Sequence, residues 1–433
     1  MVDHVKFFRQ TSPYINMHRG KTFVIAISGD GVMHGNFPHV IQDIALLHSL
    51  GIRIVLVHGT RPQIEQRLAE HDIRPQFQGQ TRITDTRAMD CVKEAVGHTR
   101  VDIEGLLSMG LANSPMHGAR IRVIGGNFIT ARPVGVRDGI DFHHTGEVRK
   151  IDRAGIERQL NDGAMVLLSS LGYSATGEAF NLTFEEVATK TATALSAEKL
   201  VFFCGSRGIN NSAGELRRMI SLPEVENCLS ELDDMGLRNL LKAGHLACQG
   251  GVPRCHYISY ERDGALLNEL FTRDGEGTLL LHDGNLIVRS AGIEDIPGLL
   301  DIIGPLEETG VLVKRSRELL ETEISRFRLV VDAEQVIVAC AALYPFADHK
   351  SAELACVATH TDYRNRGLAS RLLNDIESQA KHQGLEQLFV LTTQTAHWFL
   401  EHGFVSADLS ALPAERKELY NFQRNSKIFV KQL

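Results

Sequence analysis

Short apolar runs alternate with amphipathic segments over the first part of the chain. Residues 22–27 and 52–57 are apolar enough to be buried strands, and apolar side chains from Ile41 to Leu50 recur between them at helical spacing. Gly51 follows as a typical helix-terminating residue. A strand, a helix and a strand in this order predict a βαβ unit and a parallel sheet covered by helices. The predicted fold class is α/β, an open α/β/α sandwich, because the scheme continues at residues 120–124, 164–168, 199–203 and 255–259.

The pattern restarts around residues 281–285, where turn residues interrupt the apolar runs. We therefore predict two domains, residues 1–284 and residues 285–433, since 433 residues exceed what one core usually supports. The second domain opens with a strand and two helices. Its predicted strands span residues 286–289, 336–343, 352–358, 388–392 and 428–430, and its predicted helices span residues 293–308 and 316–327 and include Leu372, Leu373, Ile376 and Ala380.

The composition favours work on a small molecule. A formal net charge of -7 argues against a general nucleic-acid binder. The sequence has no apolar stretch near the roughly 20 residues that span a bilayer, and Met1 to Lys6 do not resemble a signal peptide. The seven cysteines form neither a C-x-x-C motif nor a zinc-type spacing, as suits a reducing compartment. We expect a cytoplasmic protein without a metal, a membrane or a nucleic-acid partner.

A phosphate-binding turn is predicted from Arg364 to Ala369, between the strand at 352–358 and the helix that follows. The small residues Gly367 and Ala369 let the backbone close on a pyrophosphate, which the N–H groups and dipole of the helix start would favour. Arg364 and Arg366 add cationic donors. An ordinary strand-to-helix turn with surface arginines is the alternative.

This turn, in this context, resembles the acyl-CoA signature of the GNAT superfamily of N-acetyltransferases. Residues 285–433 resemble the GNAT fold over nearly their whole length, which implies acetyl-CoA as the co-substrate. The strand at 388–392 would then splay away from the strand at 352–358 to admit the pantetheine arm. The residues that the resemblance assigns to the acetyl-CoA site are Cys356, Val357, Arg364, Asn365, Arg366, Gly367, Leu368 and Ala369, with Val357 acting through its main chain.

The first domain resembles the amino acid kinase family, and acetylglutamate kinase in particular, over most of residues 20–280. The matching pieces follow the family's order and include residues 57–59, 82–85, 180–182 and 263–271. Ala26 stands where the family has a lysine, and Thr60 and Arg61 occupy the second glycine-rich turn. Phosphoryl transfer depends on charge around the phosphates and the metal. We therefore expect the kinase fold without kinase chemistry.

The same resemblance points to an effector site in the first domain. In arginine-sensitive acetylglutamate kinases, a segment matching 266–278 and an N-terminal helix enclose L-arginine. Here Glu269 would face the guanidinium, Gly275 would bring backbone groups to the amino acid, and Tyr14 would close the pocket. The alternative is a solvated glutamate at a helix end, followed by turn glycines.

Glu353 is the candidate general base, because an acetyltransferase must remove a proton from its acceptor ammonium. Strand alternation predicts that its side chain faces away from those of Leu354 and Cys356. A carboxylate facing water on an edge strand is the alternative. Thr392 is the candidate donor of a proton to the leaving thiolate. We assign Cys356 packing or a main-chain contact, because nothing in its sequence surroundings would lower the pKa of the thiol.

Cationic residues indicate an anionic acceptor. Two basic clusters, at 313–317 and 420–427, would suit the two carboxylates of a dicarboxylic amino acid. The whole chain resembles the N-acetylglutamate synthases, and Arg315, Arg424 and Ser426 match their substrate-binding positions. For the other cations of the clusters we prefer surface salt bridges.

The resemblance implies an acetyl-CoA:L-glutamate N-acetyltransferase that makes N-acetyl-L-glutamate in the first step of L-arginine biosynthesis and is feedback-regulated by L-arginine. It also implies a homo-oligomer, a hexamer or another ring. Two alternatives remain open from the residues. One is an acetylglutamate kinase with an accessory acyltransferase domain, and the other is a non-catalytic sensor of arginine and CoA.

Overall fold

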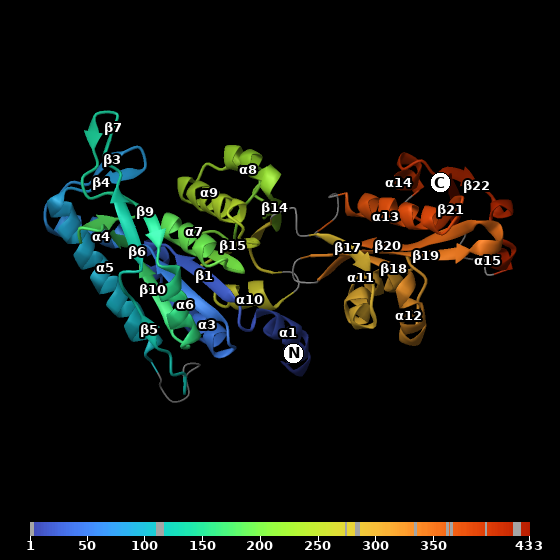
Figure 1. Cartoon of the computed structure of the whole chain (residues 1–433), viewed down its shortest axis with the longest axis horizontal. Helices are drawn as coiled ribbons and strands as arrows, with labels where there is room; N and C mark the ends of the chain where they lie inside the picture. The colour runs from blue at the N-terminus through green and yellow to red at the C-terminus, as the bar shows by residue number, and fades with distance from the viewer. Residues whose placement is uncertain are drawn as a thin grey trace. The chain divides into compact units, whose positions relative to one another are not determined.

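Two units make up the chain, Met1–Asp283 and Gly284–Leu433, and each is described by itself (Figure 1). The structure is a computed structural model. It describes residues 4–109, 117–272, 275–281, 286–332, 336–360, 363, 367–394, 396–418 and 426–433. Among these residues, every helix is too short or too polar to cross a membrane.

An eight-stranded sheet in the order β14-β16-β15-β13-β1-β2-β10-β5 forms the centre of the first unit. From β15 to β5 neighbouring strands run parallel, whereas β16 runs antiparallel to β15. The strands are β1 Thr22–Ile27, β2 Arg53–His58, β5 Val123–Ile124, β10 Met165–Ser169, β13 Lys199–Cys204, β14 Met219–Ser221, β15 Arg254–Ser259 and β16 Thr278–Leu281. Every residue of β1 is buried because helices cover both faces of the sheet, which explains why the strand is apolar after Thr22.

The two faces have separate cores. Phe23 and Ile25 of β1 pack on the side of α1 His4–His18, α3 Phe37–Ser49, α5 Thr86–Leu107 and α10 Ala265–Phe271. Val24 and Ala26 pack on the opposite side, against α6 Arg153–Asn161, α7 Phe184–Ala194, α8 Val225–Glu231 and α9 Met235–Gln249. The predicted α/β/α sandwich is confirmed.

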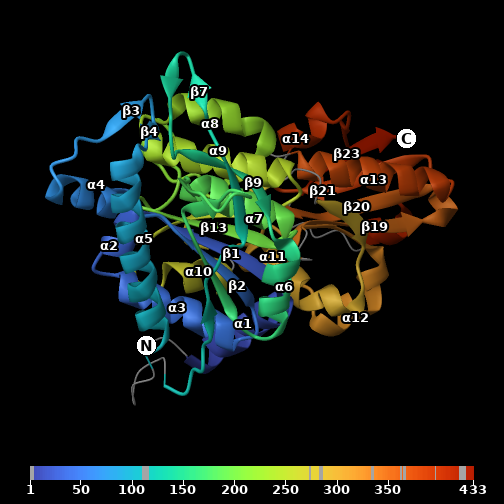
Figure 2. The ribbon, with the colours of Figure 1, turned by 60° about the vertical axis from the view of Figure 1, so that its left-hand side comes forward.

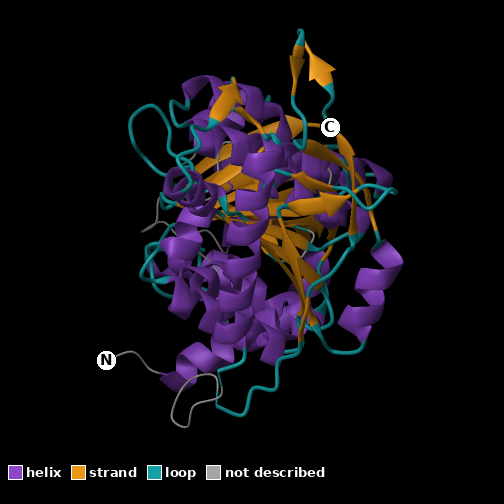
Figure 3. Cartoon of the chain, turned by 90° about the vertical axis from the view of Figure 1, so that its left-hand side faces the viewer, coloured by secondary structure: helices purple, strands orange, loops and turns teal. Residues whose placement is uncertain are grey.

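Smaller elements surround this sandwich. A four-stranded sheet contributes side chains to the second core, and its strands are β12 Ala179–Asn181, β11 Leu171–Tyr173, β6 Ile129–Pro133 and β9 Gly146–Ile151. The hairpin of β7 Val136–Arg137 and β8 Ile140–Asp141 projects from the unit (Figures 2 and 3). The remaining elements are α2 Gly29–Met33, α4 Arg61–Glu70, β3 Gln76–Gln78 and β4 Thr81–Ile83.

The second unit is built on a seven-stranded sheet in the order β17-β18-β19-β20-β21-β23-β22. Its strands are β17 Ile287–Ser290, β18 Phe327–Val331, β19 Ile337–Phe346, β20 Ser351–Thr359, β21 Gln387–Thr392, β22 Val405–Ala407 and β23 Lys427–Gln432. Figure 1 shows α13 Leu368–His382 on one face of the sheet and α11 Ile296–Glu308 and α12 Arg317–Glu323 on the other. Two short helices, α14 Ala396–Glu401 and α15 Ala414–Glu418, complete the described part.

The strands β20 and β21 form a fork. They pair in parallel only from Ser351 with Gln387 to Glu353 with Phe389, although β20 continues to Thr359 and β21 to Thr392. The predicted splay between these strands is confirmed. Glu353 therefore lies at the last paired position, where the fork opens.

Candidate active site

Glu353 does not face open water. It pairs with Tyr344 across the antiparallel strands β19 and β20, and its side chain is 13% exposed. Arg416 of α15 donates to both carboxylate oxygens, from Nε to Oε2 at 2.6 Å and from Nη2 to Oε1 at 3.1 Å. The alternative of a solvated edge-strand carboxylate is therefore wrong.

A β-bulge follows Glu353 in the strand. The pairing with β19 shifts between Ala355 and Ala358, and Cys356 has a φ of 53°. Two residues of β20 then oppose one residue of β19, so the alternation of faces is broken. The Cys356 side chain packs with Cys340 and Ala342, on the face that Tyr344 and Glu353 share. The prediction that Glu353 and Cys356 face opposite sides is wrong for this reason, whereas Leu354 does lie on the other face.

The Cys356 thiol is surrounded by charge without being activated. Burial raises the pKa of Cys356 to about 11, although the neighbouring Arg315 lowers it. The thiol is therefore protonated at neutral pH, as expected for a packing residue. The bulge also redirects the main chain of Cys356 and Val357 at the mouth of the fork, where the sequence predicts main-chain contacts to acetyl-CoA.

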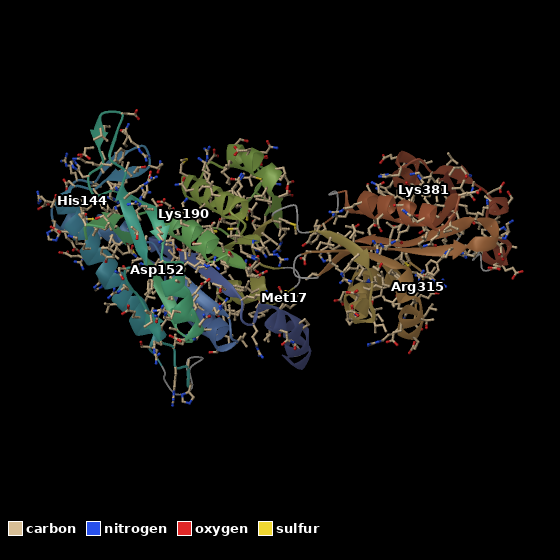
Figure 4. All side chains as sticks on the ribbon, in the orientation of Figure 1. Met17, His144, Asp152, Lys190, Arg315 and Lys381 are labelled. Carbon is tan, nitrogen blue, oxygen red and sulfur yellow. The ribbon has the colours of Figure 1, made fainter. Side chains whose placement is uncertain are left out.

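Arg315 lies on the same face of the sheet as Cys356, at the start of α12 (Figure 4). Its backbone N–H donates to Glu307 Oε1 at 3.1 Å, and its Nη1 donates to the Val313 carbonyl at 2.9 Å. Burial lowers the pKa of the Arg315 guanidinium, but Cys356, Tyr344 and Glu307 together raise it above its usual range. The Arg315 guanidinium is thus permanently charged and lies beside β20, the strand that carries the predicted base Glu353.

Tyr344 lies between Arg315 and Glu353, and no motif in the sequence singles it out. Its hydroxyl donates to Glu323 Oε2 at 2.7 Å, and Arg326 lies over its ring, 4.9 Å from the centroid. Burial raises the pKa of Tyr344, so the phenol stays neutral. The only hint in the sequence is its place in a strand next to Glu353, which needs the hairpin register to become visible.

The predicted acetyl-CoA turn lies partly outside the described residues, which exclude Arg364, Asn365 and Arg366. Gly367 precedes α13 with a φ of 70°, in the left-handed region that favours glycine. Leu368 is buried at the first position of α13, and Ala369 follows it. The backbone N–H groups at this helix start have the arrangement that suits a phosphate.

Thr392 and Ser426 lie near each other at the other side of the fork. Thr392 ends β21 and pairs with Lys427, the first residue of β23, which Ser426 directly precedes. The Thr392 hydroxyl accepts a hydrogen bond from the Gln394 backbone at 3.3 Å. Arg424, the third predicted substrate residue, lies outside the described residues.

In the first unit, Glu269 is a buried carboxylate whose side chain is 5% exposed. His256 Nδ1 donates to Oε1 at 2.6 Å, and the backbone N–H groups of Glu276 and Gly277 donate to Oε2 at 2.6 and 2.8 Å. Burial raises the pKa of Glu269, but the hydrogen bonds from His256 and from the two backbone N–H groups outweigh burial and lower this pKa to about 2. The alternative of a solvated helix-end glutamate is wrong.

The other two residues of the predicted effector site lie against this carboxylate or its helix. Gly275 has a φ of 62°, and a Cβ there would stand 2.9 Å from Glu269 Oε2, so only glycine fits. Tyr14 of α1 packs in the core that contains Leu270 and Phe271 of α10. The three positions are thus gathered around one helix of the first unit.

Comparison with known proteins now decides the family. Residues 21–259 match the Amino acid kinase family, and residues 299–404 match the Acetyltransferase (GNAT) family. Amino-acid acetyltransferases of Ectopseudomonas mendocina and Pseudomonas putida are 53% and 54% identical to the chain, over 100% of it and 100% of each relative. The chain belongs to the amino-acid acetyltransferases.

A solved structure agrees with this assignment. The N-acetylglutamate synthase of Neisseria gonorrhoeae, complexed with coenzyme A and L-arginine, is 36% identical and covers 99% of this chain and 99% of its own, with a TM-score of 0.80. The same protein complexed with coenzyme A and N-acetyl-glutamate has a TM-score of 0.63. Both predicted domain families and the predicted enzyme class are confirmed.

In this amino-acid acetyltransferase the kinase-like unit contains a cavity beside β1 and β2. This cavity, of about 660 Å³, is lined by the two turns that follow β1 and β2, together with Asn181. Gln63 Nε2 donates to the Gly29 carbonyl at 2.9 Å, so a side chain of α4 closes on the first turn. Ala26 is buried in the core of β1. Within the described residues, His, Cys, Asp and Glu form no group of three that could hold a metal ion.

Proposed function

We propose that the chain is an acetyl-CoA:L-glutamate N-acetyltransferase that makes N-acetyl-L-glutamate, the first step of L-arginine biosynthesis, under feedback control by L-arginine. The observation that carries the proposal is the position of Glu353 at the point where β20 and β21 separate, on the face that also carries Cys356 beside Arg315. The relative from Neisseria supports the substrates and the effector, since its structures contain coenzyme A, L-arginine and N-acetyl-glutamate.

The proposed reaction uses the residues of the fork as follows. Glu353 accepts a proton from the glutamate ammonium, directly or through a water molecule. The neutral amine attacks the thioester carbonyl carbon, which forms the C–N bond and an oxyanion. When the oxyanion collapses, the C–S bond breaks and the second proton of the nitrogen passes to the leaving thiolate. We assign this transfer to the Thr392 hydroxyl, which donates its own proton to the thiolate and takes up the proton from the nitrogen, directly or through a water molecule.

Glutamate recognition is assigned to the cations and the serine predicted from the sequence. Arg315 is supported by its fixed charge beside Cys356, since a guanidinium matches a carboxylate in both geometry and charge. Ser426 is supported by its place next to the pair of Thr392 and Lys427. Arg424 is proposed on the family resemblance alone.

We assign acetylation to residues 285–433 and arginine binding to residues 1–284, which lack kinase chemistry. Glu269, Gly275 and Tyr14 form the proposed arginine site, and the guanidinium would approach the Glu269 carboxylate. This carboxylate accepts three hydrogen bonds, and its two oxygens have about four acceptor positions. Cytoplasmic location and a homo-oligomer, with a hexamer as the expected form, stay predictions.

An assay of the full chain tests the function. Release of CoA thiol is measured with acetyl-CoA and L-glutamate, with L-glutamine and L-aspartate as matched acceptors. ATP consumption with N-acetyl-L-glutamate is measured in parallel. We expect acetylation that prefers glutamate and is inhibited by L-arginine. Turnover of ATP without thiol release would overturn the proposal, and so would CoA binding without turnover.

A further inference from the structure

The residue that holds Glu353 is itself a candidate part of the machinery. The Arg416 guanidinium contacts both oxygens of Glu353 in a bidentate pair, and only 20% of the Arg416 side chain is exposed. The planar guanidinium donates to both oxygens and so fixes the plane of the carboxylate. A lysine ammonium would leave that plane free to rotate. The orientation of the predicted base is therefore set by a side chain 63 residues further along the chain.

Apolar packing just before the short helix α15 holds Arg416 close to Glu353. Leu412, just before α15, is buried in a cluster with Phe389 and Ile428. Phe389 is the residue of β21 that pairs with Glu353 at the fork. Arg416 is partly buried, while its neighbours Glu415 and Lys417 are exposed, so Arg416 is the side chain that α15 directs to the fork. Leu412 packs on Phe389 and Arg416 pairs with Glu353, so both contacts are made where the pairing of β20 and β21 ends.

We propose that Arg416 is a positioning residue for acetyl transfer, which orients the Glu353 carboxylate toward the acceptor amine. The inference rests on the proposed function, in which Glu353 is the base. Proton transfer needs the base within about 3 Å of the amine and correctly oriented, so a free rotation of the carboxylate would slow the step. The guanidinium also places positive charge beside the acceptor, and like charge favours the neutral, reactive amine.

The test is a double-mutant cycle on the full chain. The variants are Arg416→Lys, Glu353→Gln and the double variant, and Lys417→Gln is the matched control because it removes an exposed cation from the same helix. We expect Arg416→Lys to lower kcat roughly 10- to 100-fold, in the range of a misplaced catalytic group, with the KM for glutamate and for acetyl-CoA retained. In the Glu353→Gln background the same change should cost far less, because its partner is already lost.

A second measurement separates positioning from folding. Arg416→Ala should recover part of its kcat when methylguanidinium is added, while Lys417→Gln should show no effect of methylguanidinium. Equal losses in both backgrounds would overturn the inference, because Arg416 would then act independently of Glu353. So would a rise in the glutamate KM with kcat preserved, which would make Arg416 a direct ligand of the substrate. A wild-type chain that fails to acetylate glutamate would instead overturn the proposed function.

Discussion

Glu353 and Glu269 are two buried carboxylates that the chain holds in different ways. Glu353 is paired with one side chain, the guanidinium of Arg416. Glu269 is held by the ring of His256 and by two successive backbone N–H groups. The exposed fractions of the two side chains are also different, 13% for Glu353 and 5% for Glu269.

The difference fits the two roles that we propose. Backbone donors cannot rotate away, so Glu269 presents one fixed charge to a ligand, as a binding site requires. A base must also be reached by its proton donor. In the proposed role, Arg416 holds Glu353 from α15, and the side of the carboxylate that faces the fork is left for the donor. In this proposal the two units use the same residue type for recognition and for proton transfer, and each role predicts a different response to the loss of charge.

The largest effect is expected for Glu353→Gln. This change keeps the size of the side chain but removes its basicity, so kcat should fall by about two to four decades while acetyl-CoA still binds. The measurement is thiol release at saturating substrates, with acetyl-CoA binding followed by calorimetry. A kcat near the wild-type value at neutral pH would assign the proton transfer to another group.

A smaller effect is expected for Arg315→Gln. The change removes a partly buried cation beside Cys356 and Tyr344, so the glutamate KM should rise about 30- to 1000-fold, equivalent to about 2 to 4 kcal/mol. Arg317→Gln is the matched control, because Arg317 is 66% exposed and pairs with Glu321 on the surface. A rise confined to the acetyl-CoA KM would remove Arg315 from the acceptor site.

The sequence was sufficient for the framework of this site and insufficient for its partners. Periodicity placed the strands, and strand pairing ends at Glu353 because β20 and β21 separate there. Arg416 has no such signal: it lies in a short charged helix without apolar periodicity, and its contact depends on tertiary packing by Leu412. The bulge escaped notice because Cys356 adopts a positive φ without being glycine.

The first unit follows the same rule. The family resemblance points to Glu269, but His256 lies in a buried strand where the sequence indicates only a buried position. A histidine within a strand of this kind is not distinguished by pattern from one that simply packs. Its role becomes visible only when β15 and α10 are placed side by side, because its partner lies on a different element.

Glu269→Gln is expected to weaken L-arginine binding on the order of 1.5 to 3 kcal/mol, roughly 10- to 100-fold, because the guanidinium loses its charged partner. The pocket should keep most of its hydrogen bonds. The glutamine oxygen can accept the two backbone N–H groups, and His256 can accept from the amide if its ring proton moves to Nε2, at the cost of a buried N–H without a hydrogen-bond partner. Acetylation without arginine should be retained because the proposed acetylation site lies in the other unit.

Calorimetry with L-arginine and inhibition of thiol release on the same preparation measure this effect. Binding coupled to inhibition must be reciprocal, so bound substrates should change the arginine affinity by the factor by which arginine changes theirs. Glu261→Gln serves as the control, because Glu261 is an exposed carboxylate of the same unit. A variant that stays fully inhibited would place the arginine sensor elsewhere.

The smallest effect concerns His18, which joins α1 to the arginine-site helix by a 3.0 Å hydrogen bond between its Nε2 and the Leu270 carbonyl. Burial lowers the pKa of His18 to about 3, so the folded chain keeps the ring neutral over a range in which the unfolded chain protonates it. The unfolded state then binds more protons below about pH 6.5, and stability falls as the pH is lowered from there toward 3.

His18→Gln keeps a donor for Leu270 without a titrating group, so its melting temperature should fall less between pH 7 and pH 4, roughly the interval that the shift spans. His245→Gln, at a partly exposed histidine, is the control, and a wild-type slope in His18→Gln would show that α1 does not hold a neutral histidine against the proposed site.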